Sequence, residues 1–551
     1  MSTKKKRFSL GMKPEMINCL KGYQKKSLIS DLTAGLLVAI VALPLSIAFG
    51  IQSGSTLQAG LITAIIGGFC ISAFGGTRFS IGGPAAAFIV ITAGYISTPG
   101  IGLPGMLIIV LMSGVLLILM GLLKVGRLLK YVPFPIILGF TAGIGFVLLF
   151  GQLKDFLGLT LPNGNPADFI PKLSEYGRNI GSVNFYSLGV GAVTLAIIYG
   201  LQKINKKIPG VIIAIVAMTG LTVAAGAIFG DKIHISTIGS AYGDIKTEFT
   251  FISAFDFSSV QFGSLILPAI VISLLSALEG LMSATVAEGM TKKAYDANME
   301  LVGHGLANIG SGLLGGLPVT GVIARTSVNI FSGGKTPVAG MFHSVLLLVM
   351  YFALMPVMKF IPFPVLAAVL IKVAIGMSRF PLLAKFVKFS KRDAAIIAVS
   401  FFLTIFLSLI YGVLVGLALA IILNIKNMKR GLKITVEEVK DAFAAVTEAL
   451  DVEGNPVPEL PGEKCFRVSG ALYFISVVKL IDFVKKQCAD TPEIVLDMSE
   501  VHSVDATALE KLMKFKEFSE ANELKIELVN FNPKATARYR TAKRNLALSA
   551  E

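Results

Sequence analysis

Long apolar stretches, separated by short polar loops, fill the chain from about residue 31 to residue 428. A helix that crosses a bilayer needs about 20 predominantly apolar residues, and most of these stretches approach that length. We predict fourteen membrane segments, at 31–52, 57–74, 84–98, 103–123, 132–153, 184–201, 209–229, 262–284, 297–315, 319–331, 338–358, 364–379, 393–410 and 411–428. The third and the tenth are the shortest, too short to cross a membrane as complete helices.

The composition agrees with this pattern. The chain is 54% hydrophobic and 15% charged, with a mean hydropathy of +0.75, which indicates a polytopic membrane protein. The formal net charge of +16 comes from short basic clusters between apolar segments, as the positive-inside rule predicts for cytoplasmic loops, so no nucleic-acid partner is expected. An even number of segments places both termini on one side of the membrane, and the basic clusters assign that side to the cytoplasm. We expect a multi-pass protein of the inner (plasma) membrane, with residues 1–30 as a cytoplasmic tail and not a cleaved signal.

The membrane region repeats itself. The heptad KYVPFPI at 130–136 recurs as KFIPFPV at 359–365, and each copy opens the fifth segment of a half. Two segments earlier stand GGPAAA at 82–87 and GLPVTG at 316–321, which pairs Pro84 with Pro318. The membrane domain, 31–428, therefore divides into two repeats, at about 31–229 and 262–428. Because seven segments is an odd number, the second repeat enters from the opposite side, which makes the repeat inverted.

The tail, 437–551, has a different pattern. Strand-like runs near 465–474, 493–498 and 525–529 alternate with helical runs at 477–488 and 506–520. This alternation predicts a small α/β domain with a largely parallel sheet, long enough to fold on its own.

The two short segments suggest chemistry. A helix that begins at membrane depth leaves its first N–H groups without water, which is tolerated where the backbone lines a cavity. Such N–H groups and the positive end of the helix dipole suit an anion, and Arg325 lies in the tenth segment. Paired short segments at matching places in two halves mark the substrate site of many transporters. Arg325 could bind the anion directly, raise the local potential, or only pair with a carboxylate. We hypothesise an anion transporter.

Glu279 is the carboxylate inside the otherwise apolar stretch 268–285. An intramembrane acid can carry a proton or ligate sodium, and Ser283, one turn later, could hydrogen-bond it or add an oxygen to an ion site. The alternative is that Glu279 only neutralises Arg325 and holds two helices together. In the first segment Pro44 is expected to break the helix, and Phe49 either presents a ring edge to an anion or simply packs. Asp31 is expected to cap the first helix.

These motifs resemble those of the SulP sulfate permease family. The resemblance rests on ALPLSIAF at 42–49, GPAAAF at 83–88, LEGLMS at 278–283 and PVTGVIART at 318–326. The tail, with LDMS at 496–499 and VDATAL at 504–509, looks like a STAS domain. The resemblance covers about 25–545. It implies fourteen segments in a 7+7 inverted repeat, a core domain (segments 1–4 and 8–11), a gate domain (5–7 and 12–14), a homodimer and an elevator-like motion.

The resemblance also implies a site. The anion would lie between Phe49, the third-segment N-terminus at Ala85 and Ala86, and the tenth-segment N-terminus, with Arg325 behind it; the tenth-segment positions are Val322, Ile323 and Ala324. Glu279 takes the place of the coupling acid, with Ser283 beside it. Sodium-coupled bicarbonate carriers of the family have Asp there and hydroxyls on the tenth segment, so Glu with apolar neighbours favours a proton. The STAS phosphorylation position is Ala506, which puts that switch in doubt, and a dimer contact or a soluble partner is expected instead.

The resulting hypothesis is a proton-coupled secondary transporter of a small inorganic or carboxylate anion, of the sulfate, bicarbonate or C4-dicarboxylate class. A sodium-coupled bicarbonate symporter, an uncoupled exchanger or channel, and a nucleobase carrier of the same fold remain alternatives. No cofactor is expected besides the coupling proton or sodium, and no metal. An enzyme is not expected, because the sequence offers no nucleophile–base set and no nucleotide loop.

Overall fold

The computed structural model describes residues 12–21, 23–126, 134–162, 164–166, 169–204, 210–229, 235–242, 251–291, 293–378, 383, 391–406, 415–416, 418–419, 422, 435–439, 464–473, 476–487, 493–504, 506–521 and 525–531. The chain divides into two compact units, 1–129 with 144–377 and 130–143 with 378–551. Each unit is described by itself.

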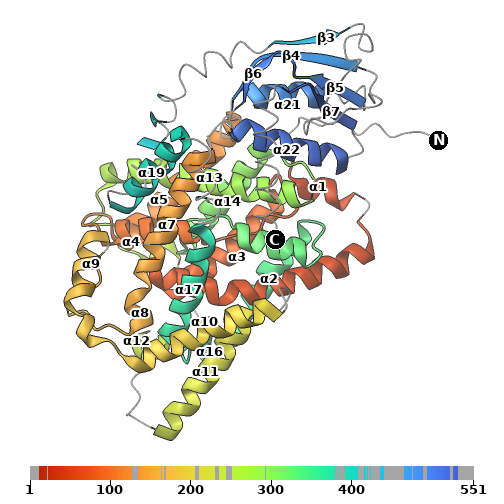
Figure 1. Ribbon diagram of the computed structural model, residues 1–551. Coiled ribbons are helices and arrows are strands. Elements are labelled where there is room, and N and C mark those ends of the chain that lie inside the picture. The colour runs from red at the N-terminus through yellow and green to blue at the C-terminus, as the bar shows by residue number, and fades with distance from the viewer. Residues whose placement is uncertain are drawn as a thin grey trace. The chain divides into compact units, whose positions relative to one another are not determined.

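The first unit is helical (Figure 1). Its main elements are α1 (Glu15–Leu20), α2 (Lys25–Gln52), α3 (Leu57–Phe74), β1 (Gly82–Gly83), α4 (Ala86–Ser97), α5 (Gly102–Leu122), the later part of α7 (Phe134–Gly151), α8 (Leu153–Leu157), α9 (Phe169–Arg178), α10 (Phe185–Ile204), α11 (Gly210–Phe229), α12 (Ile238–Tyr242), α13 (Ile266–Thr291), α14 (Ala297–Leu313), β2 (Thr320–Gly321), α15 (Ile323–Phe331), α16 (Val338–Met358) and α17 (Phe363–Ser378). With α19 (Lys391–Phe406), thirteen predicted membrane segments coincide with helices. The fourteenth, 411–428, lies largely outside the described residues.

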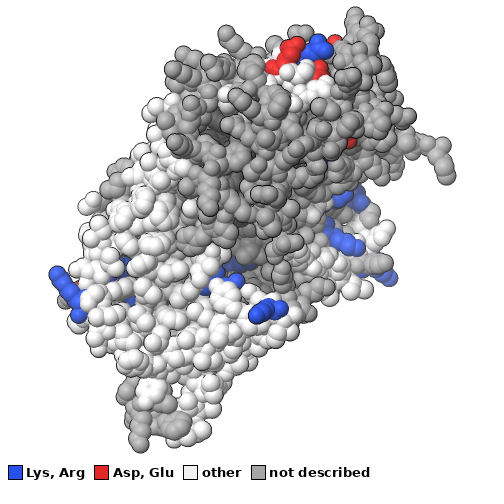
Figure 2. Space-filling view, viewed as in Figure 1, with Lys and Arg blue, Asp and Glu red and all other residues white. Residues whose placement is uncertain are grey.

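Several of these helices suit a bilayer. Among the described residues, seven helices are long and apolar enough to cross a membrane. Large apolar side chains on α10 and α11 are turned outward: Phe185 is 80% exposed, Ile228 74% and Val216 67%. In the view of Figure 2 most of the described surface of this unit is uncharged. Such a surface is expected where lipid tails, and not water, surround the helices.

Glycines let the helices of this unit approach one another closely. A Cβ built on Gly114 of α5 would lie 2.7 Å from the carbonyl oxygen of Gly305 on α14, and one built on Gly305 would lie 2.6 Å from that of Gly114. The two backbones are therefore in direct contact. In lipid this packing of small residues replaces the hydrophobic effect as the force that joins helices.

The two repeats meet in a short antiparallel ladder. Gly82 pairs with Gly321 and Gly83 with Thr320, immediately before the short helices α4 and α15. The N-caps are Ala85 and Val322, so Pro84 corresponds to Gly321. The predicted pairing of Pro84 with Pro318 was wrong by three residues. The tenth segment begins at Ile323 and not at 319, because the residues before it are extended and bonded to the rest of the protein.

The second unit contains α19 and an α/β domain. Its strands are β3 (Thr435–Val439), β4 (Lys464–Leu472), β5 (Glu493–Asp497), β6 (Val501–Val504) and β7 (Lys525–Val529), and its helices are α21 (Ser476–Gln487) and α22 (Ala506–Ala521). The order is β3-β4-β5-β7, with β6 also paired to β4. All pairings are parallel except that of β3 with β4, which confirms the predicted largely parallel sheet. Its buried core includes Val468, Leu496 and Leu509.

Candidate functional site

Two helix N-termini lie at the β1–β2 ladder, and neither has a side-chain cap. The first N–H groups of a helix have no partner inside it. The N–H of Val322 is used, because it donates to the Ile81 carbonyl at 2.9 Å. The intrahelical bonds of α15 begin with Thr326 N–H, which donates to the Val322 carbonyl at 2.9 Å. Of the predicted α15 positions, Ile323, Ala324 and Arg325 are therefore the ones whose N–H groups precede the first intrahelical bond and can face a ligand.

The two N-termini differ in accessibility. Ala85 and Ala86 at the start of α4 are 6% and 5% exposed, and Phe49 of α2 is 3% exposed in the same apolar cluster as Ala86. At the start of α15, Val322 and Ile323 are half-buried and Ala324 is exposed. A ligand can therefore reach the α15 terminus, whereas the α4 terminus and Phe49 are covered by packed side chains.

Arg325, in the first turn of α15, is almost completely buried at 1% exposure. Its Nη2 donates to Ser46 Oγ of α2 at 2.9 Å, and Ser46 Oγ donates to the Ala42 carbonyl at 2.6 Å. Its Nε and Nη1 have no hydrogen-bond partner among the described residues. Contrary to prediction, α2 is not broken at Pro44, since one helix runs from Lys25 to Gln52. The proline removes one backbone bond in that turn, next to the hydroxyl that holds the arginine.

Glu279 and Ser283 lie on α13, at 8% and 0% exposure. The hydrogen bond of Ser283 Oγ is with Thr326 Oγ1 of α15, at 3.0 Å, and Thr326 Oγ1 also accepts the Ile81 N–H at 3.1 Å. The hydrogen bond of Arg325 goes to Ser46. Ser283 and Arg325 were both expected to contact Glu279. Their hydrogen bonds go to Thr326 and Ser46 instead. Ser283 thus joins the Glu279 helix to α15 within repeat 2, and Thr326 in turn bonds Ile81 of repeat 1.

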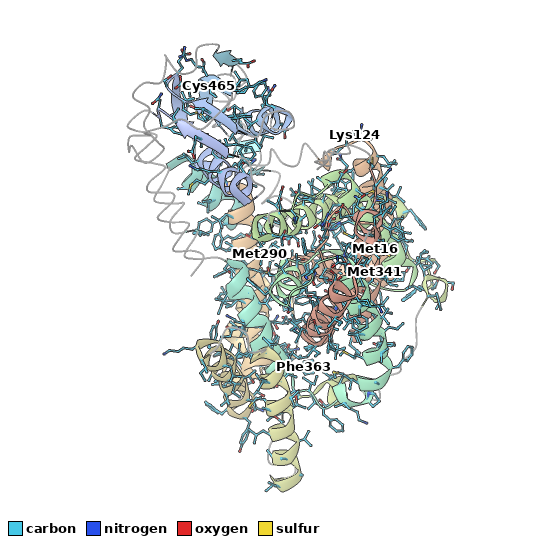
Figure 3. The ribbon with its side chains drawn as sticks, turned by 90° about the vertical axis from the view of Figure 1, so that its right-hand side faces the viewer. Met16, Lys124, Met290, Met341, Phe363 and Cys465 are labelled. Carbon is cyan, nitrogen blue, oxygen red and sulfur yellow. The ribbon has the colours of Figure 1, made fainter. Side chains whose placement is uncertain are left out.

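A second contact joins α13 to α15. Ser327 Oγ donates to the sulfur of Met290 at 3.8 Å, and Met290 (labelled in Figure 3) is the penultimate residue of α13. The helix α13, which carries Glu279, and the short helix α15 are thus joined by two side-chain contacts.

The sequence did not single out a polar face on α14. Glu300, fully buried, accepts the N–H groups of Gly76 and Thr77 at 2.8 and 3.1 Å, at the start of the loop that leads to β1. His304 and Asn308, one and two turns later, bind the backbone before α15. Their spacing of four residues inside a predicted membrane segment was the available signal, since it places all three on one helix face.

Asp31 has a different role from the predicted one. The helix α2 begins at Lys25, so Asp31 does not cap it. Its carboxylate is buried and accepts the N–H of Lys335 at 2.6 Å, both the N–H and the hydroxyl of Thr336, at 3.1 and 2.5 Å, and the Tyr23 hydroxyl at 2.8 Å. It thereby fastens the first helix of repeat 1 to the loop between α15 and α16.

Comparison with known families identifies the family of the chain. The model of the Sulfate permease family matches residues 28–400, which is more than half of the chain. The chain belongs to the Sulfate permease family. A STAS domain model matches residues 456–543. The resemblance drawn from the motifs is confirmed, as is the fold class of a helical membrane transporter with a C-terminal STAS domain.

Relatives of this family member are similar to it over most of its length. The protein named "Putative sulfate transporter YvdB" of Bacillus subtilis is 35% identical over 492 residues, 89% of this chain and 88% of its own. The bicarbonate transporter BicA of Picosynechococcus is 32% identical over 492 residues, 88% of this chain and 85% of its own. The boundaries at 1–30, 31–428 and 437–551 stay predictions.

Solved structures show the same fold. The transmembrane domain of a cyanobacterium bicarbonate transporter BicA superposes with a TM-score of 0.63 at 31% identity, over 72% of this chain and 98% of that one. The structure of SLC26A9 has a TM-score of 0.68 at 20% identity, over 96% and 88% of the two chains, and bears on the fold alone.

Proposed function

We propose that this member of the Sulfate permease family is a secondary transporter that carries a small anion across the membrane. The observation that carries the proposal is Arg325, a buried cation with two nitrogens that lack a hydrogen-bond partner among the described residues, in the first turn of an uncapped half-helix. A buried charge without a counter-charge costs several kcal/mol, and a bound anion would offset that cost.

The anion would lie at the starts of the two half-helices. Ile323 and Ala324 offer N–H groups on the accessible side, Ala85 and Ala86 mark the opposite half-helix, and Phe49 packs beside it. Both helix dipoles would favour negative charge there, and Arg325 would add a full charge from behind. Backbone N–H groups can donate hydrogen bonds to any small anion. The named relatives include a sulfate and a bicarbonate transporter, so we propose sulfate, bicarbonate or a C4-dicarboxylate as the substrate class.

We also propose that transport is coupled to protons through Glu279. A carboxylate at 8% exposure in a membrane helix is costly to bury while it is charged, and protonation removes that charge. Such a group can therefore take up and release a proton during transport. The competing idea is sodium, with Ser283 as a ligand. The Ser283 hydroxyl is hydrogen-bonded to Thr326 at 3.0 Å. The tenth-segment positions of the proposed site, Val322 and Ile323, have no side-chain oxygen to complete a sodium site. This favours the proton.

We also propose an elevator-like motion, which the bonding within the first unit supports. Buried hydrogen bonds join the two repeats: Thr326 to Ile81, Leu317 N–H to Thr63 Oγ1 at 2.6 Å, and Thr336 to Asp31. We propose that α2–α5 and α13–α16 therefore move as one body that carries the anion. A homodimer, in which the partner supports the immobile part, and a regulatory partner for the STAS domain belong to the same proposal.

Uptake into proteoliposomes tests the function. The purified protein is reconstituted, and uptake of labelled sulfate, bicarbonate, succinate and fumarate is measured with and without inward proton and sodium gradients. We expect one anion class to accumulate under the proton gradient. Uptake driven only by the sodium gradient would establish the sodium symporter. Uptake without accumulation under either gradient would establish the exchanger or channel. No anion uptake together with uracil uptake would refute the proposal.

Glu279→Gln separates coupling from binding. A glutamine keeps the size and the polarity of the side chain but cannot carry a proton, so we expect anion exchange to persist and proton-driven accumulation to be lost. The matched control is Glu288→Gln, nine residues later on the same helix, which should accumulate the anion like the unmodified protein. Accumulation that remains fully proton-driven in Glu279→Gln would contradict the coupling role.

A further inference from the structure

Residues 317–321, which lead into α15, are bound on one side by side chains of α14. Asn308 Oδ1 accepts the N–H of Val319 at 3.0 Å, and Asn308 Nδ2 donates to the Val319 carbonyl at 2.9 Å. His304 Nε2 accepts the N–H of Gly321 at 2.8 Å, and Ser311 Oγ donates to the Leu317 carbonyl at 2.7 Å. Every second residue of the segment is thus held by one helix.

The geometry of the two elements explains the match. Two residues of a strand advance about 6.6 Å, and one turn of four residues on a helix advances about 6 Å. Side chains at 304, 308 and 311 can therefore meet backbone groups at 321, 319 and 317 in register. The alternate residues face the other way, as Val322 N–H does when it donates to the Ile81 carbonyl. The side chains on this face of α14 therefore bond the free edge of residues 317–321, as a third strand beside the β1–β2 ladder would.

His304 is fixed in one form by its two hydrogen bonds. Because Nε2 accepts the Gly321 N–H, the proton of the neutral ring lies on Nδ1, which donates to the Glu300 carbonyl at 2.7 Å. The ring is fully buried, and a Cβ built on Gly280, the neighbour of Glu279, would collide with Nε2. The imidazole therefore lies between the Glu279 helix and the strand that ends at Gly321.

We propose that His304, supported by Asn308, is a positioning residue for the anion site. Gly321 is two residues before the start of α15, so its position determines where the N–H groups of Ile323 and Ala324 point. Removal of the acceptor at Nε2 leaves the Gly321 N–H buried and unsatisfied, which releases the helix start and weakens anion binding. The inference rests on the proposed anion function, because it assigns the determinants of affinity at that site.

Two substitutions at His304 separate positioning from bulk. Gln can place Oε1 where Nε2 stood and keep an acceptor for Gly321, whereas Asn places its polar group near Nδ1 and leaves Gly321 without one. We expect His304→Asn to raise the KM of the best transported of sulfate, bicarbonate, succinate and fumarate about tenfold, with the maximal rate within about twofold. His304→Gln should have a KM within about threefold of that of the unmodified protein.

Amide hydrogen exchange gives a readout that needs no transport. The Gly321 amide should exchange faster in His304→Asn than in His304→Gln or in the unmodified protein, in the same detergent. Equal KM values in the two variants of a transporting protein would overturn the proposal, as would equal exchange at Gly321. If the unmodified protein moves no anion, the proposed function fails, while unchanged exchange in His304→Asn still decides against positioning.

Discussion

The guanidinium group of Arg325 packs against the backbone of Gly83, across the line where the two repeats meet. A Cβ on Gly83 would collide with Nη1 of Arg325, and the φ of Gly83, +154°, is one that other residues rarely adopt. Glycine at this position therefore leaves room for the buried cation and permits the backbone to turn toward α4.

Gly83→Ala should abolish or strongly reduce anion uptake. The added methyl displaces the guanidinium from its place beside Ser46, and the backbone strain adds about 1–3 kcal/mol. The measurement is initial uptake into proteoliposomes at equal amounts of reconstituted protein. The matched control is Gly94→Ala on α4, where a Cβ would meet nothing within 4 Å, and which should retain uptake. Normal uptake by Gly83→Ala would mean that the position of Arg325 is not critical.

Replacement of Arg325 should weaken the affinity for the anion more than it lowers the maximal transport rate. In Arg325→Gln the buried charge is lost, and we expect KM for the anion to rise by about tenfold or more, the equivalent of about 1.4 kcal/mol or more. Arg325→Lys keeps the charge but not the fixed fork of donors, so its KM should fall between those of the other two proteins. Concentration-dependent uptake distinguishes the three. A lower maximal rate at unchanged KM in Arg325→Gln would assign the arginine to the fold and not to the anion.

Much of this architecture could be predicted from hydrophobic patterning. Thirteen of the fourteen predicted membrane segments coincide with helices, because burial of apolar faces depends on local periodicity. In the tail β4, β5, β7, α21 and α22 lie where alternation placed them, whereas β3 and β6 were not predicted. The start of α15 at Ile323 could not be predicted from the hydrophobic pattern, which placed it at 319; the family resemblance alone placed it at 322–324. Its position depends on hydrogen bonds from His304, Asn308 and Ile81, which pattern alone does not connect to residues 317–322.

The same limit applies to the site. Arg325 and Glu279 could be singled out, because a charge in an apolar segment is conspicuous, but the partner of Arg325 is Ser46, 279 positions away. Ser46 carries no signal of its own in a sequence with many buried serines. The roles of Phe49, Ala85, Ala86, Ile323, Ala324, Arg325, Glu279 and Ser283 in transport stay predictions, and Val322 contributes a backbone N–H that is already bonded.

A methyl group at Gly280 should disturb transport without touching Glu279. In Gly280→Ala the new Cβ collides with His304 Nε2, so either α13 or the ring must shift, and the Gly321 bond is strained. We expect at least a several-fold loss of uptake. Gly289→Ala, on the same helix and with nothing within 4 Å of its Cβ, should behave like the unmodified protein. Equal uptake by both variants would show that the contact between α13 and His304 can relax freely.

The short helix α1 can be tested through Cys19. Glu15 at its start donates its N–H to the Gly75 carbonyl at 3.0 Å, and its carboxylate pairs with Arg78 Nε at 2.7 Å. Burial in this docked position raises the pKa of the Cys19 thiol to about 11, and the nearby Glu15 carboxylate adds to the rise. Because the thiolate is the form that reacts, alkylation at pH 8 should be about 100-fold slower than in the unfolded chain.

The rate should then increase about tenfold per pH unit until pH approaches 11, whereas in the unfolded chain it levels off near the ordinary thiol pKa. Mass spectrometry of the alkylated Cys19 peptide measures it separately from the other cysteines. Arg78→Gln sharpens the test, since Arg78 lowers the pKa of this thiol and its half-exposed ion pair is worth about 0–1 kcal/mol. If α1 remains docked through Gly75, the variant should label more slowly, because the lowering charge is gone. Faster labelling would mean instead that the ion pair is what keeps α1 on the protein.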